Sequence, residues 1–109
     1  MRVEVRCHGI ESSGALLRQA LRLTRFGLSR FSTKVVDVTV RLSDTNGPRG
    51  GKDKRCRILV RIAGGNLLAV EELGVDVQAV LALAARRVVH TVGRHLAQPD
   101  WTRQREPGQ

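Results

Sequence analysis

The chain has 109 residues, of which 41% are hydrophobic and 27% charged, a composition typical of one globular domain and not of a disordered chain. Lysine and arginine number 19 against 10 aspartate and glutamate, so the formal net charge is +9 and the isoelectric point is about 11.4. No hydrophobic run approaches the roughly 18 residues that a membrane-spanning helix needs. A small basic domain of this kind favours a polyanionic partner, most often a nucleic acid.

Residues 2–8 alternate between small hydrophobic and charged side chains, and Val3, Val5 and Cys7 share one side. This period of two predicts a half-buried strand. It leaves no apolar leader segment at the N-terminus, so we expect the protein to remain in the cytoplasm. Cys7 and Cys56 lack CxxC or metal-ligand spacing, which fits reduced, buried thiols in that compartment.

Residues 14–29 follow Ser12 and Ser13, which can cap a helix, and their hydrophobic side chains recur every three or four positions. A helix is therefore predicted here. Its expected buried stripe consists of Leu17, Ala20, Leu21, Thr24, Leu28 and Phe31.

Three further strands are predicted, at residues 34–44, 55–63 and 67–73, since hydrophobic and polar residues alternate in each, most weakly in the last. The expected inward residues are Val36, Val38, Val40 and Leu42 in the first of them and Cys56, Ile58, Val60 and Ile62 in the second. A glycine-rich connection at 45–53 and a short turn at 64–66 separate the three strands.

The last predicted element is a helix from the N-cap residue Asp76 to about Ala97, ended by Gln98 and Pro99. Its expected buried stripe consists of Val77, Leu81, Ala84, Val88, Val92 and Leu96. Residues 98–109 lack periodicity and are predicted to form a flexible C-terminal tail.

The predicted order is β-α-β-β-β-α, an α+β fold in one domain spanning residues 1–97. The first helix connects two strands that should be parallel, and the two later connections should form antiparallel pairs. Alternating strands bury only one face, so both helices should pack on the same face of a four-stranded mixed sheet.

The sequence gives little support for a catalytic site, a metal site or a nucleotide-binding site. The connection carries Asn46 where a phosphate-binding loop needs its first glycine, and Asp53 where that loop needs a hydroxyl. His90 and His95 are five positions apart and do not share a helix face as paired metal ligands would. No serine, histidine and acid grouping forms a recognisable motif, so we expect neither enzymatic activity nor a cofactor.

The arginines carry the strongest functional indication, because the predicted helices contain no aspartate or glutamate between residues 14 and 29 or between 77 and 97. Uncompensated like charges at helical spacing cost stability unless a partner neutralises them, and arginine forms bidentate contacts with phosphate. The candidate RNA-binding residues are Arg18, Arg22 and Arg25 on the first helix, Arg86, Arg87 and Arg94 on the second, and Arg49, Lys52 and Lys54 around the connection. The two helical rows are expected to form one broad basic face.

The aromatic residues, Phe26, Phe31 and Trp101, are too few and do not occupy outward strand positions, which argues against a sheet that stacks on single-stranded bases. No helix-turn-helix or zinc-finger spacing occurs. Structured RNA, recognised through its shape and phosphates, is the partner that remains.

Residues 41–56, with the sequence RLSDTNGPRGGKDKRC, resemble the hairpin of the short ribosome hibernation promoting factors, also called the ribosome-associated inhibitor A or sigma-54 modulation family. The resemblance covers about residues 1–97. Arg87 matches a basic family position, whereas Gln78 and Leu83 depart from the family pattern. The resemblance implies a stress factor that binds small-subunit rRNA in the decoding channel of the ribosome and inhibits translation, without the additional domain that pairs ribosomes in long members.

Two alternatives remain open at this point. The protein could bind structured RNA generally, with the same arginines and no dedicated ribosomal site. It could also be a regulator that binds another protein through the exposed sheet face around Arg57, Leu59 and Arg61.

Overall fold

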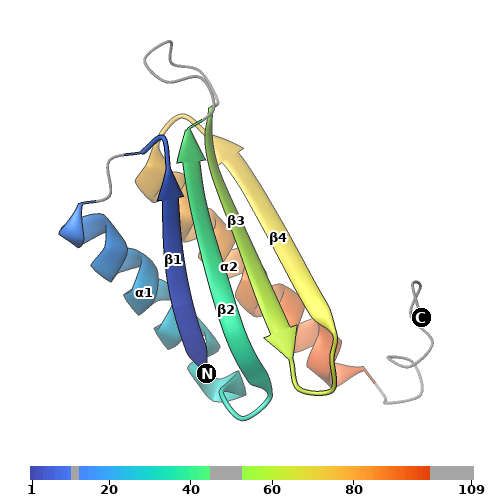
Figure 1. The fold of residues 1–109 in the computed structure, drawn as a ribbon. Helices are drawn as coiled ribbons and strands as arrows, with labels where there is room; N and C mark the ends of the chain where they lie inside the picture. Colours follow the sequence, from blue (N-terminus) through green and yellow to red (C-terminus); the bar gives the residue numbers. More distant parts are fainter. Residues whose placement is uncertain (11–12, 45–52, 99–109) are drawn as a thin grey trace.

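The structure, a computed structural model, describes residues 1–10, 13–44 and 53–98 (Figure 1). Its elements follow the predicted order, with a short 3₁₀ turn at Ser29–Phe31 after the first helix. They are β1 (Arg2–His8), α1 (Gly14–Leu28), β2 (Val35–Asp44), β3 (Lys54–Ile62), β4 (Leu67–Gly74) and α2 (Val77–Ala97).

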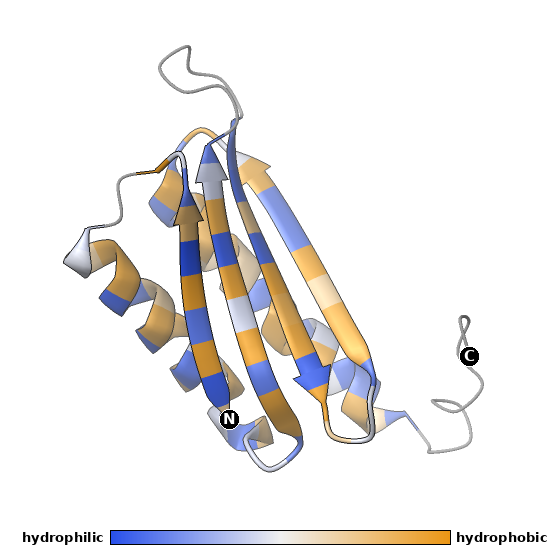
Figure 2. Ribbon diagram, viewed as in Figure 1, coloured by the Kyte–Doolittle hydropathy of each residue, from blue (hydrophilic) through white to orange (hydrophobic). Residues whose placement is uncertain are grey.

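The four strands form one sheet in the order β1-β2-β3-β4, in which β1 and β2 are parallel and the other pairs antiparallel. Both helices lie behind this sheet in Figure 1, so one face is covered and the other is open. The predicted α+β topology is therefore confirmed. The alternating colours along the strands in Figure 2 reflect the same division into a buried and an open face.

The hydrophobic core lies between the sheet and the two helices. The predicted inward residues of β3 are all buried, and so are three of the four predicted in β2. Ala20 and Leu28 of α1 and Leu81, Val88 and Val92 of α2 close the core from the other side. β1 is an edge strand, so its inward residues are only half-buried.

The prediction that Val36 points inward in β2 is wrong. Its side chain is 48% exposed, whereas Val35 is buried. The pairing with β3 shifts between Val35 and Asp37, which marks a β-bulge. The extra residue reverses the alternation of buried and exposed side chains at the start of the strand. A prediction that assumes a regular period of two cannot detect this change.

The buried row of α1 also differs from the predicted stripe. Leu16, Ala20, Thr24 and Leu28 are buried at intervals of four residues, whereas the predicted Leu17 and Leu21 are only half-buried. Phe31, beyond the helix, is half-buried too.

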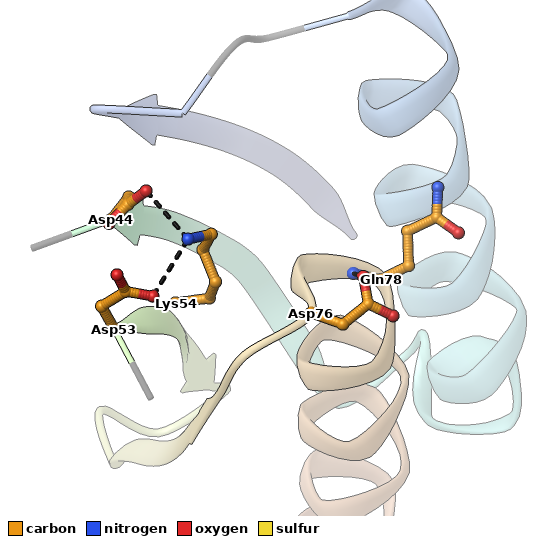
Figure 3. Close-up of polar contacts among 5 residues, drawn as sticks. All are labelled: Asp44, Asp53, Lys54, Asp76 and Gln78. Atoms are coloured by element: carbon orange, nitrogen blue, oxygen red, sulfur yellow. Dashed lines mark hydrogen bonds and ion pairs between the residues drawn. The ribbon is translucent and has the colours of Figure 1, made fainter. Parts of the chain in front are cut away.

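The residues before both helices act as the predicted caps. The Ser13 hydroxyl accepts a hydrogen bond of 3.1 Å from the Leu16 N–H, and the Asp76 carboxylate accepts one of 3.4 Å from the Gln78 N–H (Figure 3). On α2 the structure adds Val80, Ala85 and His95 to the predicted stripe, while Val77 and Leu96 are half-buried. None of the helices in the described part of the chain is long and apolar enough to cross a membrane.

Candidate nucleic-acid interface

One row of arginines follows the outer side of α1. Arg18, Arg22 and Arg25 are all exposed, and the buried Ala20 and Thr24 occupy the opposite side of the helix. Within the described residues no carboxylate lies within 4.0 Å of any of these three arginines. The row spans seven positions, or about 10 Å along the helix axis. The described part of the chain therefore does not neutralise the charge of this row.

The arginines of α2 divide into two environments. Arg86 and Arg94 are exposed and have no ion pair with any described carboxylate. Arg87 is also exposed, but its Nη1 donates hydrogen bonds to Glu72 Oε2 at 2.7 Å and to the Glu71 carbonyl at 3.2 Å, both on β4.

The other side of α2 faces α1 and the 3₁₀ turn. A Cβ added at Gly27 would lie 2.8 Å from Val89 Cγ2, and one at Gly93 would lie 3.4 Å from the Phe31 ring. Arg87 therefore points toward β4 and away from α1. Arg87 thus lies on the β4 side of α2, and the single basic face across both helices stays a prediction.

A hollow of about 350 Å³ lies between the 3₁₀ turn and the C-terminal half of α2. Arg30, His90 and Arg94 contribute its polar lining, and the Arg30 guanidinium lies 4.8 Å from the centroid of the Phe31 ring. Sequence reasoning did not include Arg30 among the candidate residues. Arg30 directly precedes Phe31, the last residue of the predicted buried stripe, and this position could have indicated that Arg30 lies beside the helices. The hollow adds a concave, basic element to the helical face.

Phe26 is a second residue that the sequence reasoning passed over. Its side chain is 82% exposed, on the same helix as the basic row and four positions after Arg22. An exposed aromatic ring among arginines offers a stacking surface for an unpaired base. The sequence argument considered aromatic residues at strand positions only, whereas this one lies on a helix.

Lys54 is held within the fold. Its Nζ lies 3.0 Å from Asp44 Oδ2 and 3.0 Å from Asp53 Oδ1, and its side chain is 22% exposed (Figure 3). The hydrogen bond to Asp53 and, to a smaller extent, the one to Asp44 raise the pKa of Lys54. These contacts tie the end of β2 to the start of β3. The other two candidates of this region, Arg49 and Lys52, lie outside the described residues, as does the tail from residue 99 onward.

The thiols are free and poorly suited to nucleophilic chemistry. Burial, with a smaller effect of Glu72, raises the pKa of Cys56 to about 12. Burial also raises the pKa of Cys7. Within the described residues, no group of three or more histidine, cysteine, aspartate or glutamate side chains could hold a metal ion.

No protein-family model matches the chain, and no curated protein matches it in sequence. Two solved structures have a similar fold. The Thermus thermophilus Protein Y N-terminal domain has a TM-score of 0.70 and 23% identity over 86% of this chain and 98% of that one. A ribosomal subunit interface protein from Coxiella burnetii has a TM-score of 0.70 and 16% identity over 90% of this chain and 100% of that one. The fold that the sequence resemblance implied is confirmed, and the chain has the fold of these two proteins.

Proposed function

We propose that the protein is a ribosome-associated factor that binds small-subunit rRNA in the decoding channel and inhibits translation during stress or stationary phase. The observation that carries this proposal is the helical side of the molecule, where exposed arginines have no partner among the described carboxylates. These residues are Arg18, Arg22, Arg25, Arg86 and Arg94. The similarity in fold to a protein described as a ribosomal subunit interface protein supports the choice of the ribosome over RNA in general.

The physical basis of binding is phosphate neutralisation. Each arginine that contacts a phosphate releases condensed counterions, and its planar guanidinium can bind two phosphate oxygens at once. The intramolecular repulsion along the row at Arg18, Arg22 and Arg25 is relieved when phosphates bind between the side chains. Binding to RNA would therefore reduce the repulsion among these three arginines.

Inhibition follows from occupancy in this proposal. A folded domain in the decoding channel excludes mRNA and tRNA sterically, so the protein needs no catalytic group and no cofactor. Its place of action is the cytoplasm, where its partner is found.

Co-migration with ribosomes on a sucrose gradient tests the proposal. We expect the protein to migrate with small subunits and whole ribosomes at low salt, and the Arg18→Glu, Arg22→Glu variant to remain at the top of the gradient. The Lys34→Glu, Arg61→Glu variant is the matched control. It makes the same change of charge at two exposed positions, one just before β2 and one near the end of β3, and should still migrate with ribosomes. Wild-type protein that remains at the top, or that migrates only with free RNA, would contradict the ribosomal assignment.

A further inference from the structure

The open face of the sheet is also rich in arginine. The pairing register places Arg6 of β1 beside Arg41 of β2, and Arg41 directly opposite Arg57 of β3. All three are exposed on the face that the helices leave uncovered (Figure 1). Strands lie about 4.8 Å apart, so the backbone positions of this row span about 10 Å.

The middle of this arginine row has no ion pair with a described carboxylate, although Arg57 lies directly opposite Glu71 of β4 in the pairing register. Arg6 Nε lies 2.6 Å from Glu4 Oε1, so that arginine has a carboxylate of its own. Arg41 and Arg57 have no described carboxylate within 4.0 Å. Like charges directly opposite each other on neighbouring strands are destabilising. An anion bound between Arg41 and Arg57 would remove this repulsion.

The arginine row borders a hollow of about 450 Å³, which supplies room for such an anion. Its lining residues are Arg6, Cys7, His8, Arg41, Leu42, Ser43, Arg55 and Arg57. This set includes four arginines, one histidine and one hydroxyl, but no phenylalanine, tyrosine or tryptophan. The hollow can therefore hold phosphates, and contacts to the phosphate backbone require no stacked base.

We propose that the sugar–phosphate backbone of a second RNA segment binds across the arginine row on the open sheet face. This inference rests on the proposed function, because it takes RNA to be the partner of the helical side. The helices and the open face lie on opposite sides of the sheet, so one RNA segment would contact each (Figure 1). The protein would then lie between two strands of structured RNA.

The test is the affinity of two paired variants for purified small ribosomal subunits over a range of salt concentrations. Arg41→Gln with Arg57→Gln should bind at least tenfold more weakly than wild type, because two phosphate contacts are lost. The slope of log affinity against log salt should become shallower by about 1.4 to 1.8. Arg41→Lys with Arg57→Lys keeps both charges and should stay within severalfold of wild type. Lys34→Gln with Arg61→Gln is the control of equal charge change.

The remaining outcomes separate this inference from the proposed function. Thermal unfolding should show that the Arg41→Gln, Arg57→Gln variant unfolds at a temperature close to that of wild type, since it loses both the repulsion between Arg41 and Arg57 and the attraction between Arg57 and Glu71. If it binds subunits like wild type while the Arg18→Gln, Arg22→Gln variant does not, the inference is wrong and the proposed function stands. If neither pair changes binding, both are wrong. If millimolar pyrophosphate alone protects wild type from thermal unfolding, and loses this effect in the Arg41→Gln, Arg57→Gln variant, the site takes a free phosphate ligand and not RNA.

Discussion

The helices and the open face of the sheet carry the same residue type in different electrostatic settings. On the open sheet face three arginines lie within 4.0 Å of a described carboxylate on that face, in the pairs Arg6–Glu4, Arg55–Glu71 and Arg61–Asp37. Among the described residues of the helices, Arg87 alone has such a contact, with Glu72 of β4. The open face of the sheet thus balances part of its charge locally, whereas the other helical arginines have no described carboxylate nearby. The number of arginines on a face does not by itself identify a binding face. Carboxylates beside the arginines reduce the positive charge that can attract a phosphate.

The largest expected effect is the dependence of ribosome binding on salt, and it tests the difference between the helices and the open face of the sheet. If five or six phosphates are engaged, log affinity should fall with log salt at a slope of roughly −4 to −5, or several hundredfold between 50 and 200 mM salt. Arg18→Gln with Arg22→Gln should make the slope shallower by about 1.4 to 1.8. Lys34→Gln with Arg61→Gln should leave it unchanged, because Arg61 already has Asp37 as its partner and Lys34 belongs to neither arginine row. Equal changes in the two variants would remove the distinction between compensated and free arginines.

A second test changes the helical layer and leaves the sheet intact. A Cβ at Gly27 would lie only 2.8 Å from Val89 Cγ2, so Gly27→Ala forces α1 and α2 apart. Overpacking costs roughly 1–3 kcal/mol, and the better helix propensity of alanine returns up to about 1 kcal/mol. We expect a net loss of about 1 kcal/mol in the free energy of unfolding, measured with urea.

The control for this substitution is the partner side chain. In a Val89→Ala background the clashing methyl group is absent, so the same Gly27→Ala change should stabilise the protein by up to about 1 kcal/mol. A change of sign between the two backgrounds identifies the helix contact as the cause. The same sign in both would show that the close approach of the helices does not limit stability.

The sequence predicted the topology and the identity of most buried strand residues, because one-sided burial leaves a period of two in the chain. It could not reveal the bulge that exposes Val36, since a single inserted residue leaves no compositional trace. The exposure of the candidate arginines on the helices followed from the same periodicity. Their partners did not, because the contact of Arg87 with Glu72 joins residues from two elements whose relative placement no local pattern encodes. Phe26 lay outside the sequence argument for a different reason, which is that aromatic side chains were weighed only on strands.

A third test concerns the buried face of the sheet. Burial keeps the pKa of Cys56 at about 12, above the value near 8.5 of an unfolded thiol. Between these values the unfolded chain loses a proton that the folded chain keeps, so stability falls as the pH rises above about 9. The decrease should approach 1.4 kcal/mol per pH unit and should be absent from Cys56→Ala. Lys54, whose pKa is raised by hydrogen bonds to Asp53 and Asp44, is present in both proteins, so the difference between them isolates the thiol. Parallel pH profiles from urea unfolding would contradict the burial of this group.

The smallest expected effect concerns Arg87, which resembles the compensated arginines of the open sheet face because it has a carboxylate partner among the described residues. Its side chain is 59% exposed, and its 2.7 Å contact with Glu72 is an ion pair at the surface, so Arg87→Gln should lower the free energy of unfolding by no more than about 0.5 kcal/mol. Arg86 has no such contact with a described residue, so Arg86→Gln should weaken ribosome binding more than Arg87→Gln does.

Glu72→Gln completes this test from the opposite direction. It leaves Arg87 in place and removes the charge that engages it, so binding to small ribosomal subunits should become severalfold tighter if the contact withholds Arg87 from phosphate. Unchanged binding in Glu72→Gln, together with a loss in Arg87→Gln as large as that in Arg86→Gln, would have a different meaning. The contact with β4 would then yield to RNA at little cost, and Arg87 would belong with the free arginines of the helices.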